Sequence, residues 1–149
     1  MHAIEIIQAK GHPNITATHS TTFEITKDKE ITKKADCIVA VEASKGARDL
    51  SPNFQTLAQS HSTKITVLFE IEGLRESMEG YGHPKLSFRH KSDLVGRKSQ
   101  FVCDRTLMVK ANKASNDFNR KFVEAIKSPD KKIMITLIAE RAPIEKVKS

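Results

Sequence analysis

The sequence has no tryptophan, one tyrosine and only two cysteines among its 149 residues. Two cysteines cannot build a disulfide framework, and neither a C-x-x-C pair nor zinc-finger spacing is present. No run approaches the roughly 18 apolar residues of a membrane-spanning helix, and charged residues interrupt the apolar N-terminal stretch where a signal peptide needs a continuous core. We therefore expect a cytoplasmic protein in which Cys37 and Cys103 are reduced thiols.

The excess of positive charge is concentrated in the second half of the chain. Lys and Arg number 25 against 18 Asp and Glu. Residues 1–72 hold eight basic and nine acidic residues, whereas residues 73–149 hold 17 and nine. Such an excess is typical of a surface that meets nucleic-acid phosphates. Aromatic residues for base stacking are scarce, however, and Tyr81 is the one evident candidate.

The chain contains an internal repeat. The stretch 11–19 recurs at 82–90 as G-H-P, two apolar positions and a closing histidine, at an offset of 71 residues. Residues 36–69 align without a gap on 104–137, with nine identical positions. A long period with two copies favours a single pseudo-twofold domain over all 149 residues, not a solenoid. The two halves are about 1–72 and 73–149.

Alternating apolar positions and turn signals place similar elements in both halves. The expected strands are 15–25, 31–43 and 64–71 in the first half and 86–94, 101–109 and 132–139 in the second, with an extra strand near Ile4. One helix begins at the capping pair Ser51-Pro52, and the other has its apolar stripe from Phe118 to Ile126. Roughly eight or nine strands and two helices, not strictly alternating, predict a mainly β (α+β) fold, an antiparallel sandwich or barrel.

Five short motifs are distinctive in combination. They are Gly11-His12-Pro13, Thr21 to Thr26, Asp36-Cys37-Ile38, Arg97-Lys98-Ser99 and Asp104 to Leu107. Together they resemble an archaeal family known as a domain of unknown function (number 371), and the resemblance covers nearly the whole chain. It implies a mainly β, sandwich-type fold and a cytoplasmic archaeal setting. It implies no activity, cofactor or catalytic residue.

Two arginines suggest an anion site. Strand alternation places Arg105 on the inward face, at the position that Cys37 occupies in the first half. A guanidinium keeps its charge, so it needs a carboxylate partner, such as Asp36, Asp93 or Asp104, or an anionic ligand. The predicted ligand-binding residues are Arg97, Lys98, Ser99, Arg105, Thr21 and Thr22, with Lys45 and Lys113 of the repeated A-x-K-x-x-x-D motif as a secondary phosphate site.

Histidines form the second candidate site. Strand parity places His19 and His90 on apolar faces, where imidazoles from the two halves would converge, whereas Glu24 has the opposite parity. Converging imidazoles with a carboxylate suit Zn²⁺ or Fe²⁺. The predicted metal ligands are His12, His19, His83, His90 and Asp36. No H-x-H or H-E-x-x-H pattern is present, and core histidines bonded to the backbone are the alternative interpretation.

Three functions follow from these sites. The leading hypothesis is a binding module for a small anionic ligand, carrying phosphate or carboxylate, or for RNA phosphate. The second is a metal-dependent hydrolytic enzyme that uses the repeated histidines, and the third is a structural or interaction protein without chemistry. Whether the protein is an enzyme stays open at this stage. It is expected to be a monomer or a homodimer formed through an unpaired sheet edge.

Overall fold

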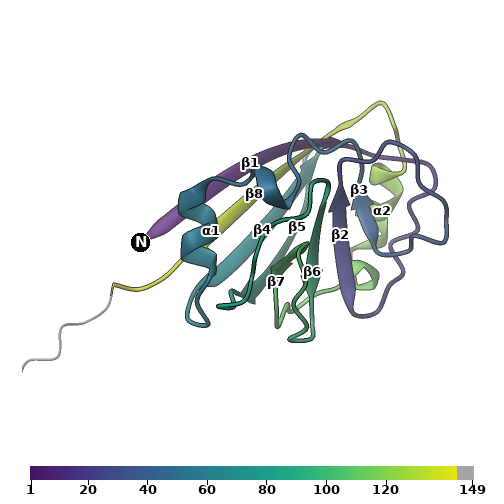
Figure 1. The fold of residues 1–149 in the computed structure, drawn as a ribbon. Helices are drawn as coiled ribbons and strands as arrows, with labels where there is room; N and C mark the ends of the chain where they lie inside the picture. Colours follow the sequence, from purple (N-terminus) through teal and green to yellow (C-terminus); the bar gives the residue numbers. More distant parts are fainter. Residues whose placement is uncertain (144–149) are drawn as a thin grey trace, which may run out of the picture.

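The computed structural model describes residues 1–143 as two four-stranded β-sheets packed face to face (Figure 1). The larger sheet, sheet A, has the strand order β1-β8-β4-β5, and all its neighbouring strands are antiparallel. Its strands are β1 (His2–Lys10), β4 (Lys64–Ile71), β5 (Leu74–Tyr81) and β8 (Lys132–Glu140). Strands β1 and β5 are the two edges of this sheet.

The smaller sheet, sheet B, has the order β3-β2-β6-β7. Its strands are β2 (Thr22–Thr26), β3 (Ile38–Ala40), β6 (Asp93–Arg97) and β7 (Thr106–Met108). The central pair β2–β6 is antiparallel, whereas β3 and β7 run parallel to their neighbours. Helices α1 (Pro52–Ala58) and α2 (Arg120–Ile126) follow the 3₁₀ turns η1 (Ala47–Asp49) and η2 (Ser115–Asp117). The predicted mainly β sandwich with two helices is confirmed. It is not closed into a barrel, and sheet B is mixed.

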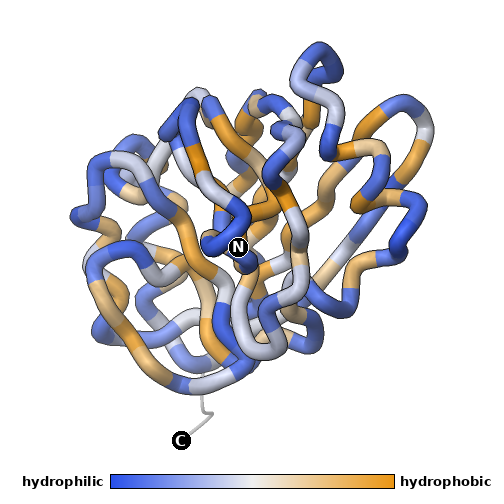
Figure 2. Tube along the Cα trace, turned by 90° about the vertical axis from the view of Figure 1, so that its right-hand side faces the viewer, coloured by the Kyte–Doolittle hydropathy of each residue, from blue (hydrophilic) through white to orange (hydrophobic). Residues whose placement is uncertain are grey.

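The facing sides of the two sheets enclose one apolar core. Because successive side chains of a strand alternate between its faces, every second residue of β4 and β8 is buried. Phe69 of sheet A meets Phe23 of sheet B edge to face, with ring centroids 6.1 Å apart, and Phe118 packs on Phe69 at 5.5 Å. Figure 2 shows hydrophobic residues recurring along the strands and hydrophilic residues in the connecting loops. The outer faces remain available for polar side chains.

Both helices begin where their capping residues dictate. The hydroxyl of Ser51 accepts the N–H of Phe54 at 3.1 Å, and Pro52 occupies the first turn. Asn119 caps α2 through its side-chain oxygen, which accepts the N–H of Lys121 at 2.8 Å. The helix start expected at Ser51-Pro52 is thus confirmed.

The G-H-P motif of each half packs against the helix of the other half. The two backbone bonds are His12 N–H to the Ile126 carbonyl (2.9 Å) and His83 N–H to the Ala58 carbonyl (3.0 Å). A Cβ on Gly82 would lie 2.0 Å from the Ala58 carbonyl oxygen, and Gly11 is equally confined against α2. The close approach of the two backbones explains why this motif begins with glycine.

Four expected strands begin later or are shorter than the apolar alternation predicts, and the one expected at 31–43 is reduced to β3. The strand expected at 15–25 begins only with β2, because Ala17 has a left-handed φ of 49° and turns the chain. Phe88, with φ of 53°, does the same before β6. The strand expected at 101–109 is reduced to β7, and Phe101 is 60% exposed in the preceding loop. Ile15, Ala17, Leu86 and Phe88 are nevertheless buried as expected, whereas alternation carried through the loop before β7 gave the wrong face for Phe101.

Strand β5 has no counterpart among the expected strands. Its inward positions include the buried Glu76 and Gly80 besides Met78, so its apolar alternation is weak. The repeat contained the missing signal at the inward positions, because Glu76, Met78 and Gly80 stand before Gly82 at the same offset as Glu5, Ile7 and Ala9 of β1 before Gly11.

Candidate functional site

The outer face of sheet B carries a buried polar cluster. Because Phe23, Ile25 and Leu94 point into the core, their strand neighbours point away from it. Two of these outward side chains are carboxylates, Glu24 on β2 and Asp93 on β6, and these residues are only 8% and 9% exposed. Residues of the segments leading into β3 and β7 contact both carboxylates, which explains how an outer face becomes buried.

Arg105, just before β7, joins the two carboxylates. Its Nη1 lies 3.3 Å from Asp93 Oδ2 and 3.6 Å from Glu24 Oε1. The hydroxyl of Thr26 donates to Asp93 Oδ1 at 2.8 Å, and His90 Nε2 lies 3.8 Å from Asp93 Oδ2. The Arg105 side chain is 44% exposed, so the inward position expected for it is wrong. The reason is that residues before β7 form a loop, where strand alternation does not apply.

Glu24 titrates far from the range of an ordinary carboxyl. Burial, followed by the negative charge of Asp93, raises the pKa of Glu24 to about 7, although Arg105 opposes the shift. The Cys37 thiol lies 4.0 Å from Glu24 Oε2. Burial and the neighbouring Glu24 raise the pKa of Cys37 to about 11, so this thiol keeps its proton at neutral pH. The cluster therefore holds a carboxyl that exchanges its proton near pH 7.

Arg97, at the end of β6, has a different set of partners. Its Nε donates to the Thr106 hydroxyl at 3.0 Å, and its Nη2 donates to the Cys103 sulfur at 3.2 Å. Its guanidinium carbon lies 4.9 Å from the centre of the Phe101 ring. Among residues 1–143, no carboxylate oxygen comes within 4.0 Å of the charged nitrogens of Arg97, in contrast to Arg105.

Cys103 lies between the two arginines. Besides the bond from Arg97, its sulfur accepts a hydrogen bond from the Thr106 hydroxyl at 3.6 Å. Burial alone would raise the pKa of Cys103, but bonds from the Arg105 backbone, the Thr106 hydroxyl and Arg97 outweigh it and lower the pKa. We call Arg97, Phe101, Cys103 and Thr106 the Arg97 corner. It presents positive charge next to hydroxyl and thiol groups.

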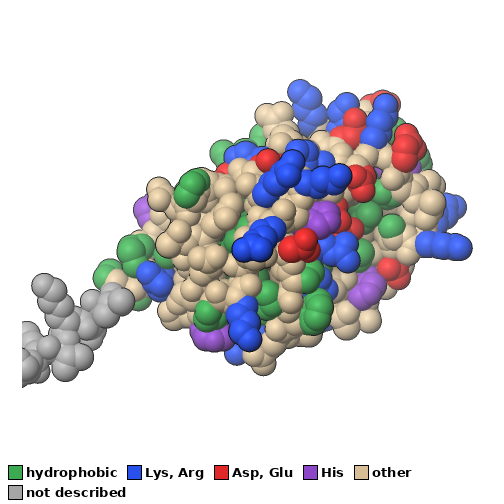
Figure 3. Space-filling model, viewed as in Figure 1, with side chains coloured by type: hydrophobic (Ala, Val, Ile, Leu, Met, Phe, Trp, Pro, Cys, Tyr) green, Lys and Arg blue, Asp and Glu red, His purple; other side chains and the backbone are tan. Residues whose placement is uncertain are grey.

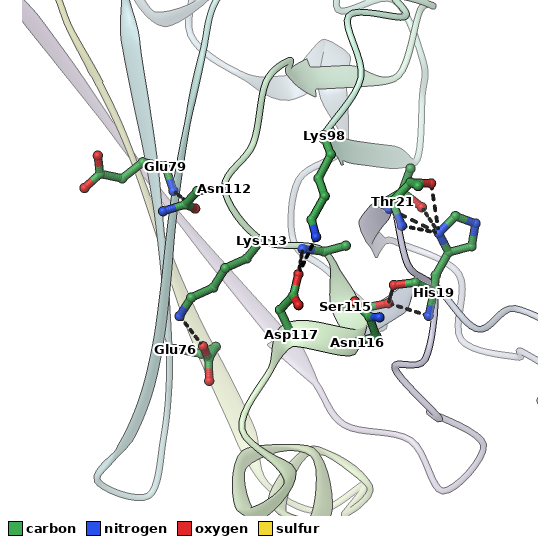
Figure 4. Close-up of polar contacts among 12 residues, drawn as sticks. His19, Thr21, Glu76, Glu79, Lys98, Asn112, Lys113, Ser115, Asn116 and Asp117 are labelled. Atoms are coloured by element: carbon green, nitrogen blue, oxygen red, sulfur yellow. Dashed lines mark hydrogen bonds and ion pairs between the residues drawn. The ribbon is translucent and has the colours of Figure 1, made fainter.

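Of the remaining predicted anion ligands, some lie near Arg97 and others lie away from it. Thr22 lies opposite Arg97 in the β2–β6 register. Lys98 bonds through its backbone N–H to the Thr21 carbonyl at 2.9 Å, but its ammonium pairs with Asp117 at 2.8 Å (Figure 4). Thr21 and Thr22 turn their hydroxyls toward a histidine ring instead of the arginines.

The two repeated lysines serve the scaffold. Lys45 Nζ lies 2.6 Å from Glu5 Oε2, and Lys113 Nζ lies 2.7 Å from Glu76 Oε1 (Figure 4). Both carboxylates are buried on sheet A and accept a further bond from the backbone N–H before a helix. The Ser99 hydroxyl accepts a backbone N–H within its own loop. That N–H belongs to Phe101, so Ser99 lies beside the Arg97 corner, whereas the structure does not bring Lys45 and Lys113 to it.

The repeated histidines stabilise turns. In all four, Nδ1 accepts a backbone N–H from two or three residues further along the chain. The donor is Asn14 for His12 and Lys85 for His83. The donors are Thr21 and Thr22 for His19, and Ser92 and Asp93 for His90. His19 and His90 precede opposite ends of the antiparallel pair β2–β6, so they do not converge. Asp36 accepts the His19 N–H through its backbone carbonyl. Within residues 1–143, no three His, Cys, Asp or Glu side chains are grouped closely enough to hold a metal ion.

Two surface cavities lie away from the predicted sites. One, of about 340 Å³, lies between Met1–Ala3, helix α1 and Arg141. The other, of about 180 Å³, lies between the ends of β1 and β8 and the segment 42–44. Neither is lined by a predicted ligand or metal residue. On the face shown in Figure 3, Lys and Arg side chains are interleaved with Asp and Glu. Neither helix of residues 1–143 has the length and apolar character of a membrane span.

Three members of the polar surface, Glu24, Cys103 and Thr106, are not among the site residues predicted from the sequence. Glu24 was set aside because its parity is opposite to that of Phe23 and Ile25; that parity is correct, and on the outer face Glu24 is the second partner of Arg105. Cys103 and Thr106 were overlooked although both lie within a few residues of Arg97 and Arg105. Polar residues cluster in the sequence just before the three-residue strand β7. This cluster was the available signal, because short loops keep sequence neighbours in contact.

Comparison with known proteins agrees with the expected resemblance. The chain matches the family model described as Domain of unknown function (DUF371) over residues 7–140. It is 43% identical to an uncharacterized protein of Methanocaldococcus jannaschii over 122 residues, which cover 82% of this chain and 90% of that protein. A match over nearly the whole sandwich, supported by this identity, shows that the chain belongs to the family described as a domain of unknown function (DUF371).

Proposed function

We propose that the protein is a binding module for a small anionic ligand that carries phosphate or carboxylate, and that Arg97 anchors this ligand. The supporting observation is the contrast between the two arginines on sheet B. Arg105 is paired with Glu24 and Asp93, whereas within residues 1–143 Arg97 bonds to a hydroxyl and a thiol without a carboxylate in reach.

The chemistry of Arg97 favours an oxyanion. A guanidinium cannot lose its proton at neutral pH, and the direct bonds of this half-buried arginine go to a hydroxyl and a thiol, so an incoming anion has no ion-paired carboxylate to displace. Its planar fork matches the geometry of phosphate and carboxylate oxygens. Phe101 lies against the guanidinium and is itself 60% exposed, so it borders the same surface. Thr106, whose hydroxyl accepts from Arg97 Nε at 3.0 Å, supplies a hydroxyl at the same corner.

The neighbouring carboxylates make the site selective for small anions over polyanions. Glu24 and Asp93 take up the charge of Arg105, so a second anion is not drawn to that arginine. A large polyanion would meet these carboxylates and the acidic side chains interleaved on this face (Figure 3). This arrangement favours a small ligand over RNA. A small phosphate ester and RNA share the recognised group, and salt dependence distinguishes them.

The test is ligand-induced stabilisation of the full chain. Phosphate, pyrophosphate, citrate and a mononucleotide are each added during thermal unfolding, and hits are measured by calorimetric titration. A ligand at 100 times its Kd adds about 2.7 kcal/mol, a shift of several degrees in Tm. Arg97→Gln should abolish that shift, and Arg97→Lys should retain only part of it. Arg89→Gln, at an exposed arginine, is the control and should bind normally.

The proposal fails if none of these anions raises Tm, or if Arg97→Gln and wild type respond equally. RNA oligonucleotides are the comparison arm. Binding to RNA alone, with a steep decrease in affinity as salt rises, would replace the small ligand by nucleic-acid phosphate.

A further inference from the structure

The two edges of sheet A are protected very differently. Alternate residues of β5 place Arg75, Ser77 and Glu79 on the outer face, and Arg75 and Glu79 form ion pairs with β4. At the equivalent positions, β1 has two isoleucines, Ile4 and Ile6, which are 55% and 54% exposed. Charged residues on an edge strand discourage pairing with another strand, and large apolar residues do not.

Within residues 1–143, the first part of the β1 edge also has backbone groups without a hydrogen-bond partner. Lys10 exchanges both backbone bonds with Val41, and Gln8 bonds through its N–H and carbonyl to Ser44. Because alternate residues of a strand direct these groups to the same side, those of His2, Ile4 and Ile6 point to the same edge. No residue of 1–143 makes a hydrogen bond to the edge-side N–H and C=O groups of Ile4 and Ile6. The open stretch therefore runs from residue 2 to residue 6 and is closed by Ser44 at residue 8.

We propose that this edge pairs with the same edge of a second copy of the chain. In this homodimer, residues 2–6 of the two copies run antiparallel about a twofold axis at Ile4, and the two four-stranded A sheets become one sheet of eight strands. Because the five open residues are centred on Ile4, a twofold axis at Ile4 pairs the open stretch of one copy with the same stretch of the other. Each copy supplies the donors and acceptors that the other lacks, and the pairing stops where Ser44 covers the edge.

The side chains in this register are mutually compatible. Ile4 faces Ile4 of the partner subunit, and Ile6 faces His2 of the partner subunit, all on the outer face. There Ile4 adjoins Ile138 of β8, so the apolar patch continues within each copy. On the inner face Glu5 meets only Ala3 of the partner subunit, and Glu5 is already neutralised by Lys45. No like charges oppose each other, which makes a second copy a better fit than a charged peptide.

The first experiment measures the mass of the full chain by sedimentation over a concentration series. Wild type should be a dimer that dissociates on dilution. Ile4→Lys places two ammonium groups opposite each other and should give a monomer. The matched control is Ser77→Lys on β5, which should remain dimeric.

The second experiment does not depend on the folding of the lysine variant. Ile4→Cys is made in a background with Cys37→Ser and Cys103→Ser, and a short bis-maleimide is added. Residues facing each other in a hydrogen-bonded antiparallel pair have Cα atoms about 5.5 Å apart, so Ile4→Cys should crosslink rapidly and Ser77→Cys should not. A wild type that is monomeric at every concentration, a dimer that survives Ile4→Lys, or equal crosslinking at both positions would overturn the proposal.

Discussion

The two halves of the molecule agree in their scaffold and differ on the outer face of sheet B. The repeated residues make the same contacts twice: histidine Nδ1 closes a turn, and aspartate caps a 3₁₀ turn. On sheet B, by contrast, Glu24 is matched in the second half by Val95, Thr26 by Arg97 and Cys37 by Arg105. A contact made twice serves the fold, so the unmatched positions are where a single ligand site can lie.

This comparison changes the interpretation of the candidate residues. The histidines and the lysines Lys45 and Lys113 were selected because they recur, yet recurrence accompanies turn closure and strand anchoring. Arg97 and Arg105 have no basic counterpart at the matched positions. Asymmetry within a symmetric scaffold is therefore the better guide to the site.

The largest effect is expected at a glycine of the scaffold. Gly82→Ala places a methyl group against the Ala58 carbonyl, where a Cβ would lie 2.0 Å from the oxygen, so the G-H-P turn must separate from α1. We expect the free energy of unfolding to fall by about 3 kcal/mol or more, as in severe overpacking. Urea denaturation provides the measurement.

Gly73→Ala is the matched control for that variant. Gly73 has a left-handed φ of 79°, but no atom lies within 4 Å of the place that an alanine Cβ would take, so only backbone strain of roughly 1 kcal/mol is added. Equal losses at the two glycines would show that the contact between the halves is not tightly packed.

The second effect is a dependence of the unfolding free energy on pH. It is carried by Glu24, whose matched position in the second half is the non-titrating Val95. Glu24 has a folded-state pKa of about 7, above the ordinary value of 4.5. The unfolded chain therefore releases this proton at lower pH than the folded chain does. The associated stability is fully present below pH 4.5 and is lost as pH rises to 7, by roughly 2–3 kcal/mol in all.

Glu24→Gln tests this effect, because glutamine stays neutral. The difference in unfolding free energy between Glu24→Gln and wild type should change in favour of the variant between pH 4.5 and 7. Glu30→Gln, at an exposed carboxylate, is the control and should follow wild type. Parallel curves for Glu24→Gln and wild type would mean that Glu24 is ionised normally in the folded protein.

The sequence predicted the parts of this structure that depend on local patterns. The alternation of β4 and β8 and the Ser51-Pro52 cap identified their elements directly. The site was less accessible, because the loop before β7 interrupts the alternation, and Arg105 does not take the inward position assigned to it. Arg97 and Arg105 were both predicted as anion ligands. Their different partners depend on the β2–β6 register, which no local pattern contains.

The smallest effect separates two lysines that look alike in sequence. Lys98→Met removes an ion pair with Asp117 in which both side chains are more than one-third exposed, so we expect a loss of no more than about 0.5 kcal/mol, reduced further by salt. Lys113→Met leaves the buried Glu76 without its cation and should cost about 1–3 kcal/mol. Both are measured by urea denaturation at two salt concentrations. Because Lys98 is held by Asp117, its loss should also leave anion binding at Arg97 within about twofold, and a larger decrease would add Lys98 to the ligand site.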